Sequence, residues 1–308
     1  NYKNSVLYST LESCSHHGKT PPCTDVIKKK NIKSVYFSKF DPDRRSFKKA
    51  KKELSKHNIK TFEDIFKSAG DNFYRDFYIK KNTNNILISS KLATSRDLFI
   101  YDKYKNWITN VYSRGRVHLL RANHDSILTT SKTILKDNSM LNCRIDGLQK
   151  YSPKRFVIDK NLSIPVTSKI IRTANKIKTY IFYNLIDNIK LKKLKRLKVI
   201  TIRIDLKNNH LDFDKIIFFL RNKGFYRVFV EAGIEFNNFL LENNYINDFY
   251  HFYSDELFGY KGFHNAKFFF NKMNKIMRDK KEIRINLFQV KSYHGNDIFE
   301  TRIPKKVF

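Results

Sequence analysis

The sequence has few cysteines, glycines and prolines, and it contains no long uninterrupted apolar run. Three cysteines among 308 residues are too few for a disulfide framework, which predicts a protein of a reducing compartment, the cytoplasm. The longest apolar stretches, such as 216–220, are far shorter than the roughly 20 residues of a membrane-spanning helix. No charged-then-apolar leader opens the sequence. We therefore expect a soluble, cytoplasmic protein without a membrane partner.

Acidic residues are scarce relative to basic ones. The chain has 61 Lys and Arg against 29 Asp and Glu, a formal net charge of +32. A basic nucleic-acid-binding protein is one interpretation of that charge. The basic residues are spread along the whole chain among many Asn, Ile, Phe and Tyr, as expected from an AT-rich genome, and even the densest run, 190–198, alternates with apolar residues like a solvated edge element. No nucleic-acid partner is therefore predicted, whereas an anionic small molecule would be attracted.

Two of the cysteines bracket a short loop, residues 12–23, which reads ESCSHHGKTPPC. This layout is typical of the thiolate half of a nucleobase-deaminase zinc site. The Pro-Pro pair predicts a helix with Cys23 in its first turn, where backbone N–H groups and the helix dipole favour a zinc-binding thiolate. Such sites also need a His ligand and a Glu acid/base upstream, and no histidine precedes Cys14. We expect these residues in a piece preceding Asn1, so no catalytic residue is assigned here.

Changes of pattern along the chain predict two domains. The interval 69–85 is polar and rich in Asn, and the boundary placed there gives domains 1–71 and 72–308. The first domain is expected to contain strands over 5–12 and 32–37 and helices from Cys23 and over 46–57. The second is expected to contain strands over 86–90, 126–130, 155–158, 179–183, 199–204, 227–230, 249–253 and 283–290, and helices over 111–121, 213–223 and 235–243. This alternation predicts an α/β fold with a mostly parallel sheet covered on both faces.

One strand of the second domain runs directly into a helix at a small-residue turn, in the segment RVFVEAGIEF, residues 227–236. Such a turn lets the pyrophosphate of a cofactor approach the backbone N–H groups of the new helix. Three further segments precede it: KLATSRD at 91–97, WIT at 107–109 and RANHDSILTTSKTILKD at 121–137. Together with the cysteine loop, these segments resemble the bifunctional riboflavin-biosynthesis enzymes, in which a pyrimidine deaminase is fused to a reductase. The resemblance covers nearly the whole chain.

The resemblance implies a fold, two activities and a set of site residues. The first domain would be part of a cytidine-deaminase-like α/β/α sandwich, and the second a dihydrofolate-reductase-like domain. The chain would take part in zinc-dependent deamination of the diamino-phosphoribosylamino-pyrimidinone and in NADPH-dependent reduction of 5-amino-6-(5-phosphoribosylamino)uracil to its ribityl form. Zinc would bind Cys14 and Cys23; NADPH would bind Trp107, Thr133, Asp137 and Gly233; and the phosphorylated pyrimidine would bind Arg121, Leu141, Arg144 and Glu231.

The chain departs from the family pattern at two positions. Ser13 stands where the family has proline, and Leu98 stands where it has glycine. The first change permits an alternative, a reductase whose deaminase segment is a relic. The second change affects the backbone expected near the nicotinamide. The sequence leaves the oligomeric state open, and a homo-oligomer is one state that it allows.

Overall fold

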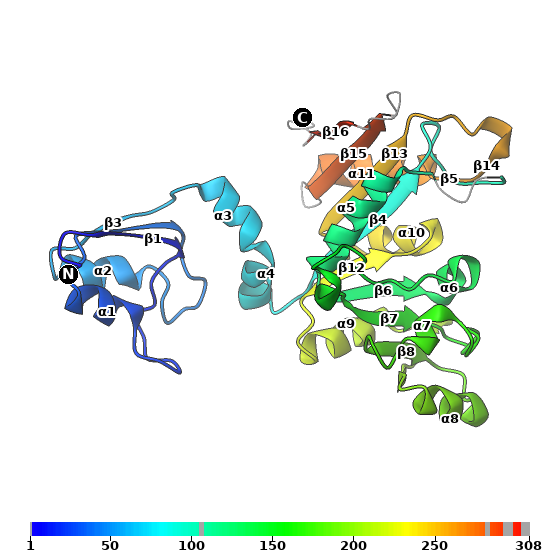
Figure 1. The fold of residues 1–308 in the computed structure, drawn as a ribbon, viewed down its shortest axis with the longest axis horizontal. Helices are drawn as coiled ribbons and strands as arrows, with labels where there is room; N and C mark the ends of the chain where they lie inside the picture. The colour runs from blue at the N-terminus through cyan, green and yellow to red at the C-terminus, as the bar shows by residue number, and fades with distance from the viewer. Residues whose placement is uncertain (1, 105–107, 281–283, 292–297, 303–308) are drawn as a thin grey trace. The chain divides into compact units, whose positions relative to one another are not determined.

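A computed structural model describes residues 2–104, 108–280, 284–291 and 298–302 of the chain (Figure 1). Trp107 lies outside these described residues. The chain divides into two compact units, Asn1–Asn85 and Ile86–Phe308. This division falls at the end of the predicted interval 69–85 and not at residue 71, and the assignment of a function to each unit stays a prediction. No helix within the described ranges is long and apolar enough to cross a membrane.

The first unit contains a three-stranded parallel sheet with α-helices on one side (Figure 1). Its small core consists of Ile27, Val35, Leu54 and Ile59. The predicted strands and helices are confirmed, whereas two helices in the interval 67–83 were not predicted. The second of these helices buries no residue. A helix with no buried face needs no apolar stripe in its sequence, so the pattern that would indicate a helix is missing. The elements are β1 (Val6–Leu11), α1 (Cys23–Lys29), β2 (Ser34–Lys39), α2 (Lys49–Ser55), β3 (Lys60–Phe62), α3 (Lys67–Phe73) and α4 (Arg75–Thr83).

The second unit is built on a nine-stranded sheet in the order β16-β15-β13-β4-β12-β6-β7-β8-β9. All neighbouring strands are parallel except β15 and β16, which are antiparallel. The predicted mostly parallel sheet and its eight predicted strands are confirmed. Its strands are β4 (Leu87–Thr94), β6 (Ser126–Thr130), β7 (Lys154–Ile158), β8 (Thr179–Tyr183), β9 (Ile200–Arg203), β12 (Arg227–Glu231), β13 (Asp248–Ser254), β15 (Arg284–Lys291) and β16 (Ile298–Arg302).

Helices cover both faces of this sheet, as predicted. Side chains of α9, α10 and α11 pack into one apolar cluster, and those of α5, α6, α7 and α8 pack into another. Successive residues of β12 alternate between the two, because Val228 and Val230 face the first cluster and Phe229 the second. The helices are α5 (Val111–Ala122), α6 (Ser131–Asp137), α7 (Lys169–Arg172), α8 (Asn188–Arg196), α9 (Phe213–Asn222), α10 (Ile234–Glu242) and α11 (Lys267–Lys280).

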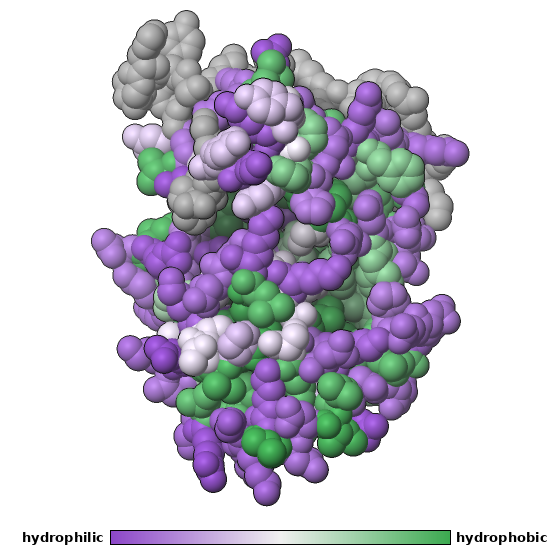
Figure 2. All heavy atoms as spheres, turned by 90° about the vertical axis from the view of Figure 1, so that its right-hand side faces the viewer, coloured by the Kyte–Doolittle hydropathy of each residue, from purple (hydrophilic) through white to green (hydrophobic). Residues whose placement is uncertain are grey.

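Smaller elements complete the second unit. Strands β5 (Phe99–Asp102) and β14 (Gly262–Asn265) form an antiparallel ribbon, β10 (Leu206–Lys207) and β11 (His210–Leu211) form a hairpin, and 3-10 turns span Gln149–Tyr151 and Gly259–Lys261. The basic run 190–198, expected as a solvated edge element, lies mostly in helix α8 with only Leu194 buried. Its leucines recur every three residues, which suits one face of a helix. The face in Figure 2 is covered mostly by hydrophilic side chains, with smaller hydrophobic patches between them.

The strand order brings three predicted motifs to one edge of the sheet. Strand β12 lies between β4 and β6 and is parallel to both. The carboxyl ends of parallel strands meet at the same edge, which is where α/β proteins bind ligands. The ends of β12 and β6 therefore present the turn at Gly233 and the start of α6 side by side. Lys91, three residues before the end of β4, lies level with Glu231 at the end of β12.

Candidate active site at the carboxyl ends of the central strands

A buried ion pair joins the end of β12 to helix α5. The Arg121 guanidinium donates two hydrogen bonds to the Glu231 carboxylate, from Nε to Oε1 at 2.6 Å and from Nη2 to Oε2 at 2.9 Å. Each side chain is only 11% exposed. Burial by itself raises the pKa of Glu231, but the charge and hydrogen bonds of Arg121 outweigh burial, so the pKa lies below its ordinary value. The pair therefore stays ionised, and it places two residues predicted from the sequence in direct contact.

A lysine that was given no role from the sequence stands beside this pair. Lys91 on β4 is the register partner of Glu231 on β12. Burial lowers the pKa of the Lys91 ammonium, and the attraction of Glu231 offsets only part of that effect. Strand register is the signal that identifies Lys91, and it becomes visible only when the strand order is known. An amine with a lowered pKa at such an edge is suited to give up a proton.

The carboxyl end of α6 adds a further acidic group to this edge. Burial raises the pKa of Asp137, and the positive charges of Lys136 and Lys91 counteract it in part. Asp137 and Glu231 therefore both act on Lys91 electrostatically. Asp137, predicted to bind the cofactor, and Glu231, predicted to bind the substrate, thus both interact with Lys91.

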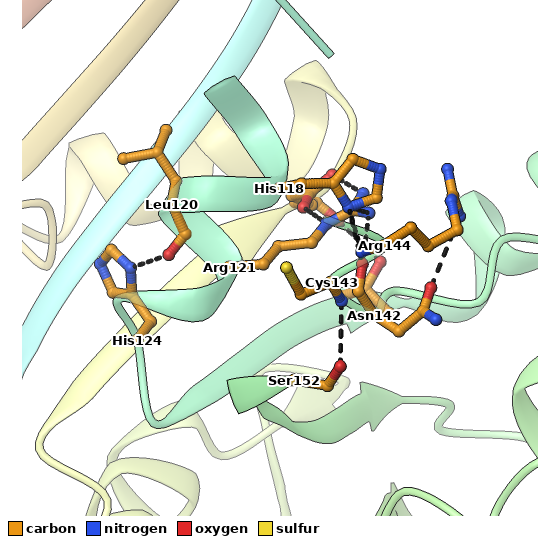
Figure 3. Close-up of polar contacts among 10 residues, drawn as sticks. His118, Leu120, Arg121, His124, Asn142, Cys143, Arg144 and Ser152 are labelled. Atoms are coloured by element: carbon orange, nitrogen blue, oxygen red, sulfur yellow. Dashed lines mark hydrogen bonds and ion pairs between the residues drawn. The ribbon is translucent and has the colours of Figure 1, made fainter. Parts of the chain in front are cut away.

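The loop after α6 approaches Arg121 from the other side (Figure 3). Arg121 Nη1 donates to the backbone carbonyl of Asn142 at 3.0 Å, and Arg144 Nη1 reaches Asn142 Oδ1 at 3.4 Å. Burial lowers the pKa of the Arg144 guanidinium, and so does the charge of Arg121. Leu141 is buried in the core with φ +50°, so its side chain packs inward and only its backbone is left for a ligand.

The first turns of α6 and α10 form the remaining side of the edge. Thr130 and Thr133 hydroxyls lie 3.3 Å apart at the start of α6, and Gly233 is the N-cap of α10. A Cβ built on Gly233 meets no atom within 4 Å, so a ligand can approach the backbone there closely. An ion pair between Lys132 and Glu235 at 2.5 Å joins the two first turns.

A buried amide that the sequence did not single out holds the turn before α10. Asn237 is fully buried, and its Nδ2 donates to the carbonyls of Ala232 and Gly233, both at 3.1 Å. Its Oδ1 accepts a hydrogen bond from the Ser90 hydroxyl on β4. The turn is thus fixed to the neighbouring strand, which keeps the helix N-terminus in place.

Leu98, which replaces the glycine of the family pattern, adopts φ +67°. This is the left-handed region that glycine favours and that costs other residues about 1 kcal/mol. Its N–H donates to the carbonyl of Ser95 at 3.1 Å, and its carbonyl accepts from Ala266 at 2.7 Å. The preceding Asp97 accepts from the N–H groups of Phe258 and Gly259. The chain therefore keeps the backbone conformation of a glycine position without the glycine.

The two cysteines of the first unit lie together. The N–H of Cys23, at the start of α1, points at the sulfur of Cys14 at 3.3 Å. The start of α1 was predicted to favour the thiolate, but burial raises the pKa of the Cys23 thiol, and the neighbouring Cys14 thiol raises it further. Within the described part of the chain, no group of three or more His, Cys, Asp or Glu residues could hold a metal ion. The sulfur pair fits two positions of a zinc shell, and the structure provides no support for the rest.

Glu12, directly before this loop, has a structural role. Its carboxylate accepts hydrogen bonds from the backbone N–H groups of Asp41, Lys48 and Ala50. Burial raises its pKa, and these hydrogen bonds oppose that effect. A carboxylate that is occupied in this way fixes the loop and the start of α2, and it is not free to move protons at the cysteines.

Comparison with known proteins identifies the family to which this chain belongs. The model of the RibD C-terminal domain matches residues 88–264, more than half of the chain. The chain belongs to the RibD C-terminal domain family. This confirms the resemblance to riboflavin-biosynthesis enzymes with a reductase domain.

Individual relatives and solved structures agree with this assignment. The riboflavin biosynthesis protein RibD of Actinobacillus pleuropneumoniae is 27% identical over 83% of this chain and 68% of its own length. RibD of Aquifex aeolicus is 31% identical over 56% of this chain and 48% of its own length. A diaminohydroxyphosphoribosylaminopyrimidine deaminase/5-amino-6-(5-phosphoribosylamino)uracil reductase of Thermotoga maritima aligns with a TM-score of 0.69 and 25% identity, over 83% of this chain and 69% of that one. Acinetobacter baumannii RibD aligns with a TM-score of 0.70 at 23% identity, over 85% and 72%, which supports the α/β fold.

Proposed function

We propose that the second unit of this RibD-family chain is an NADPH-dependent reductase. Its substrate would be 5-amino-6-(5-phosphoribosylamino)uracil, whose ribosyl side chain becomes a ribityl chain. The observation that carries the proposal is the buried Arg121–Glu231 pair with Lys91 as the register partner of Glu231, at the carboxyl ends of the central strands. Such an edge, with a glycine turn opening one of its helices, is suited to hold a dinucleotide against a polar substrate.

The first turns of α6 and α10 would hold the cofactor. Backbone N–H groups at the start of α10 attract an anion, and the open space at Gly233 lets a pyrophosphate approach them. Thr133 lies in the first turn of α6 and Asp137 is its last residue. Both would bind further polar groups of NADPH, and Trp107 is proposed as a fourth contact. NADPH supplies the hydride when it is bound. The chain's own contribution is to position it.

Arg144 would bind the substrate phosphate. Among the described residues no carboxylate forms an ion pair with Arg144, and its side chain makes only the 3.4 Å contact to Asn142. A guanidinium without an acidic partner is suited to bind a phosphate through two parallel hydrogen bonds. Arg121, by contrast, is occupied by Glu231, so its role is to fix Glu231 and the carbonyl of Asn142 against the sugar and pyrimidine.

Lys91 is our candidate for the proton donor. When the ribose ring opens, the bond from C1′ to the ring oxygen breaks, the amino proton passes to that oxygen, and C1′ forms a C=N double bond with the amino nitrogen. Hydride addition to C1′ then leaves an electron pair on that nitrogen, which needs a proton. The Lys91 ammonium can donate that proton from Nζ, because burial has already lowered its pKa. Glu231 stabilises the ammonium before the transfer, and solvent returns the proton afterwards. The reaction then balances as one hydride and one proton added to the C=N group.

The test is oxidation of NADPH by the purified chain with the phosphoribosylamino-uracil as substrate. We expect oxidation that depends on the substrate and yields the ribityl product in equal amount. Oxidation that is unchanged when the substrate is omitted, or a product in which C1′ of the ribosyl group is not reduced, would overturn the proposal. NADH in place of NADPH is the matched control for cofactor preference.

For the first unit we propose a zinc-dependent deaminase segment that supplies Cys14 and Cys23 as thiolate ligands. The support is the contact between these two residues at the start of α1. A zinc ion there would supply Lewis-acid chemistry for deamination, with a histidine ligand and a glutamate acid/base from outside the described residues. Two thiolates alone hold zinc weakly, so this chain by itself should not release ammonia from the diaminopyrimidine. Ammonia release with added zinc above that of a Cys14→Ala, Cys23→Ala control would contradict this expectation.

A further inference from the structure

His118 lies on α5 three residues before Arg121, and both side chains turn toward the segment 142–144 (Figure 3). The imidazole is 8% exposed. Its Nδ1 lies 2.9 Å from the carbonyl oxygen of Asn142, 3.2 Å from the backbone nitrogen of Arg144 and 3.4 Å from Nη1 of Arg121. One ring nitrogen therefore faces one acceptor and two donors, and its protonation decides which contact forms.

Counting donors and acceptors assigns the tautomer. The carbonyl of Asn142 accepts a hydrogen bond from Arg121 Nη1 at 3.0 Å, so it keeps a donor when Nδ1 carries no proton. The 2.9 Å contact between this oxygen and Nδ1 is then a contact between two acceptors, and it lengthens when the N–H of Arg144 is bound. The N–H of Arg144, by contrast, has His118 Nδ1 as its only acceptor among the described residues. A proton on Nδ1 would leave that partly buried N–H without its acceptor, and losing this hydrogen bond costs free energy. Nδ1 is therefore the acceptor, and the imidazole proton is on Nε2.

The surroundings keep this imidazole neutral. Burial lowers the pKa of His118 to about 4, and the positive charges of Arg121 and Arg144 act in the same direction. Glu231 and the carbonyl of Asn142 oppose this effect only in part. At neutral pH the Nδ1 lone pair is therefore available to the Arg144 N–H.

The loop that carries Arg144 is held residue by residue. Arg121 binds the carbonyl of Asn142, Ser152 Oγ accepts from the N–H of Cys143 at 3.1 Å, and His118 accepts from the N–H of Arg144. The guanidinium of Arg144 itself makes only one long contact, to Asn142. Its direction therefore depends on where its backbone is fixed, and His118 supplies the last of the three bonds.

We propose that His118 is a positioning residue, a neutral acceptor at Nδ1 that fixes the backbone of Arg144 and thereby aims its guanidinium at the phosphate of the substrate. This inference rests on the proposed function, which assigns phosphate binding to Arg144. It separates His118 from His124, whose Nδ1 lies 2.6 Å from the carbonyl of Leu120 at the end of the same helix. His124 contacts the backbone at the end of α5, whereas His118 joins α5 to the loop that contains Arg144.

Two amide substitutions distinguish positioning from packing. In His118→Asn the side-chain oxygen can take the place of Nδ1, whereas in His118→Gln the polar atoms extend to the position of Nε2. His118→Leu removes the acceptor altogether, and His124→Asn is the control for the loss of a buried histidine near the same helix end. Each chain is examined for the shift in melting temperature caused by inorganic phosphate, for substrate KM and kcat, and for NADPH affinity.

We expect His118→Gln and His118→Leu to raise the substrate KM about tenfold, the loss expected when the partly buried N–H of Arg144 loses its acceptor. Both should lose most of the phosphate-dependent rise in melting temperature that wild type shows and Arg144→Ala abolishes. His118→Asn should stay within about threefold of the wild-type KM, and NADPH affinity should change less than about twofold in every variant. His124→Asn should melt lower with an unchanged KM.

Equal behaviour of the Asn and Gln variants, or an unchanged KM and phosphate shift in both Gln and Leu variants, would overturn the proposal. So would a wild-type chain without a phosphate shift that depends on Arg144. If the wild-type chain does not reduce the pyrimidine, the proposed function fails. The phosphate titration then still decides the role of His118, because it needs no turnover: a shift kept by Asn and lost by Gln supports it.

Discussion

Lys91 and Glu231 occupy partner positions on two adjacent parallel strands, β4 and β12. Each is the titratable residue nearest the end of its strand, and the two have opposite charges. Burial lowers the pKa of the lysine, whereas Glu231 is kept ionised by Arg121. The Glu231 carboxylate thus interacts mainly with Arg121, and the Lys91 ammonium can donate its proton to a ligand.

The first prediction concerns Lys91. Lys91→Met should lower kcat about a hundredfold, the usual loss when a positioned proton donor is removed, and NADPH affinity should be little changed. Because a donor must be protonated, activity should fall as the pH rises through the pKa of Lys91, which lies below its ordinary value of 10.5. The pH profile of kcat measures this fall in activity at high pH. Lys207→Met, at an exposed lysine paired with Asp214, is the control, and an unchanged kcat in Lys91→Met would remove the assignment.

The second prediction concerns the ion pair. Glu231→Gln leaves Arg121 with a neutral partner in a site where each side chain is 11% exposed, and breaking such a pair should cost about 3 kcal/mol of unfolding free energy. A double variant, Arg121→Met with Glu231→Leu, should recover part of that loss because neither charge is left buried. Denaturant unfolding of wild type, Glu231→Gln and the double variant measures the three free energies of unfolding. A double variant less stable than Glu231→Gln would contradict it.

The same pair predicts a pH dependence of stability. The pKa of Glu231 in the folded chain lies below its ordinary value of 4.5. A carboxyl with a depressed folded-state pKa contributes stability that is complete above its unfolded-state pKa and is lost as the pH falls through the folded-state value. The stability difference between wild type and Glu231→Gln should therefore be constant at neutral pH and shrink below pH 4.5. A difference that grows on acidification would exclude this account.

The sequence predicted the sheet of the second unit well because its strands are short apolar runs separated by turns. It missed α4, whose helix has no apolar stripe, and the ribbon of β5 with β14, whose pairing joins Phe99 to a segment more than 160 positions later. Local patterns carry no information about such distant pairing. The cysteine contact was predictable, because the two residues belong to one loop.

The candidate site was predictable only in part. Arg121 and Glu231 were assigned through the resemblance, and the structure joins them in one ion pair. Lys91 was missed because its significance depends on strand order, which places β4 beside β12. Asn237 was missed because it is a buried polar residue within a helix pattern, and only its hydrogen bonds to the turn identify it.

The third prediction separates the cofactor from the fold at Gly233. Gly233 has φ −70°, which any residue adopts, and a Cβ there meets nothing within 4 Å. Gly233→Val should therefore fold with a melting temperature close to wild type and still bind NADPH about tenfold more weakly, because the side chain occupies the approach to the helix N-terminus. Fluorescence titration measures the affinity. Gly18→Val, at an equally open glycine of the first unit, is the control, and unchanged affinity in Gly233→Val would reject the cofactor assignment.

The fourth prediction separates the substrate from the cofactor at Arg144. Arg144→Ala removes the guanidinium that has no acidic partner among the described residues, so the substrate KM should rise about a hundredfold through the lost phosphate contacts. NADPH affinity should stay near wild type, in contrast to Gly233→Val. Arg144→Lys keeps the charge without the planar fork, so its substrate KM should lie between those of wild type and Arg144→Ala. Arg116→Ala, at an exposed arginine of α5, controls for the loss of one positive charge from a chain of net charge +32. If Arg116→Ala raised KM as much as Arg144→Ala, general attraction of the anionic substrate would account for the effect, and a specific phosphate contact at Arg144 would be rejected.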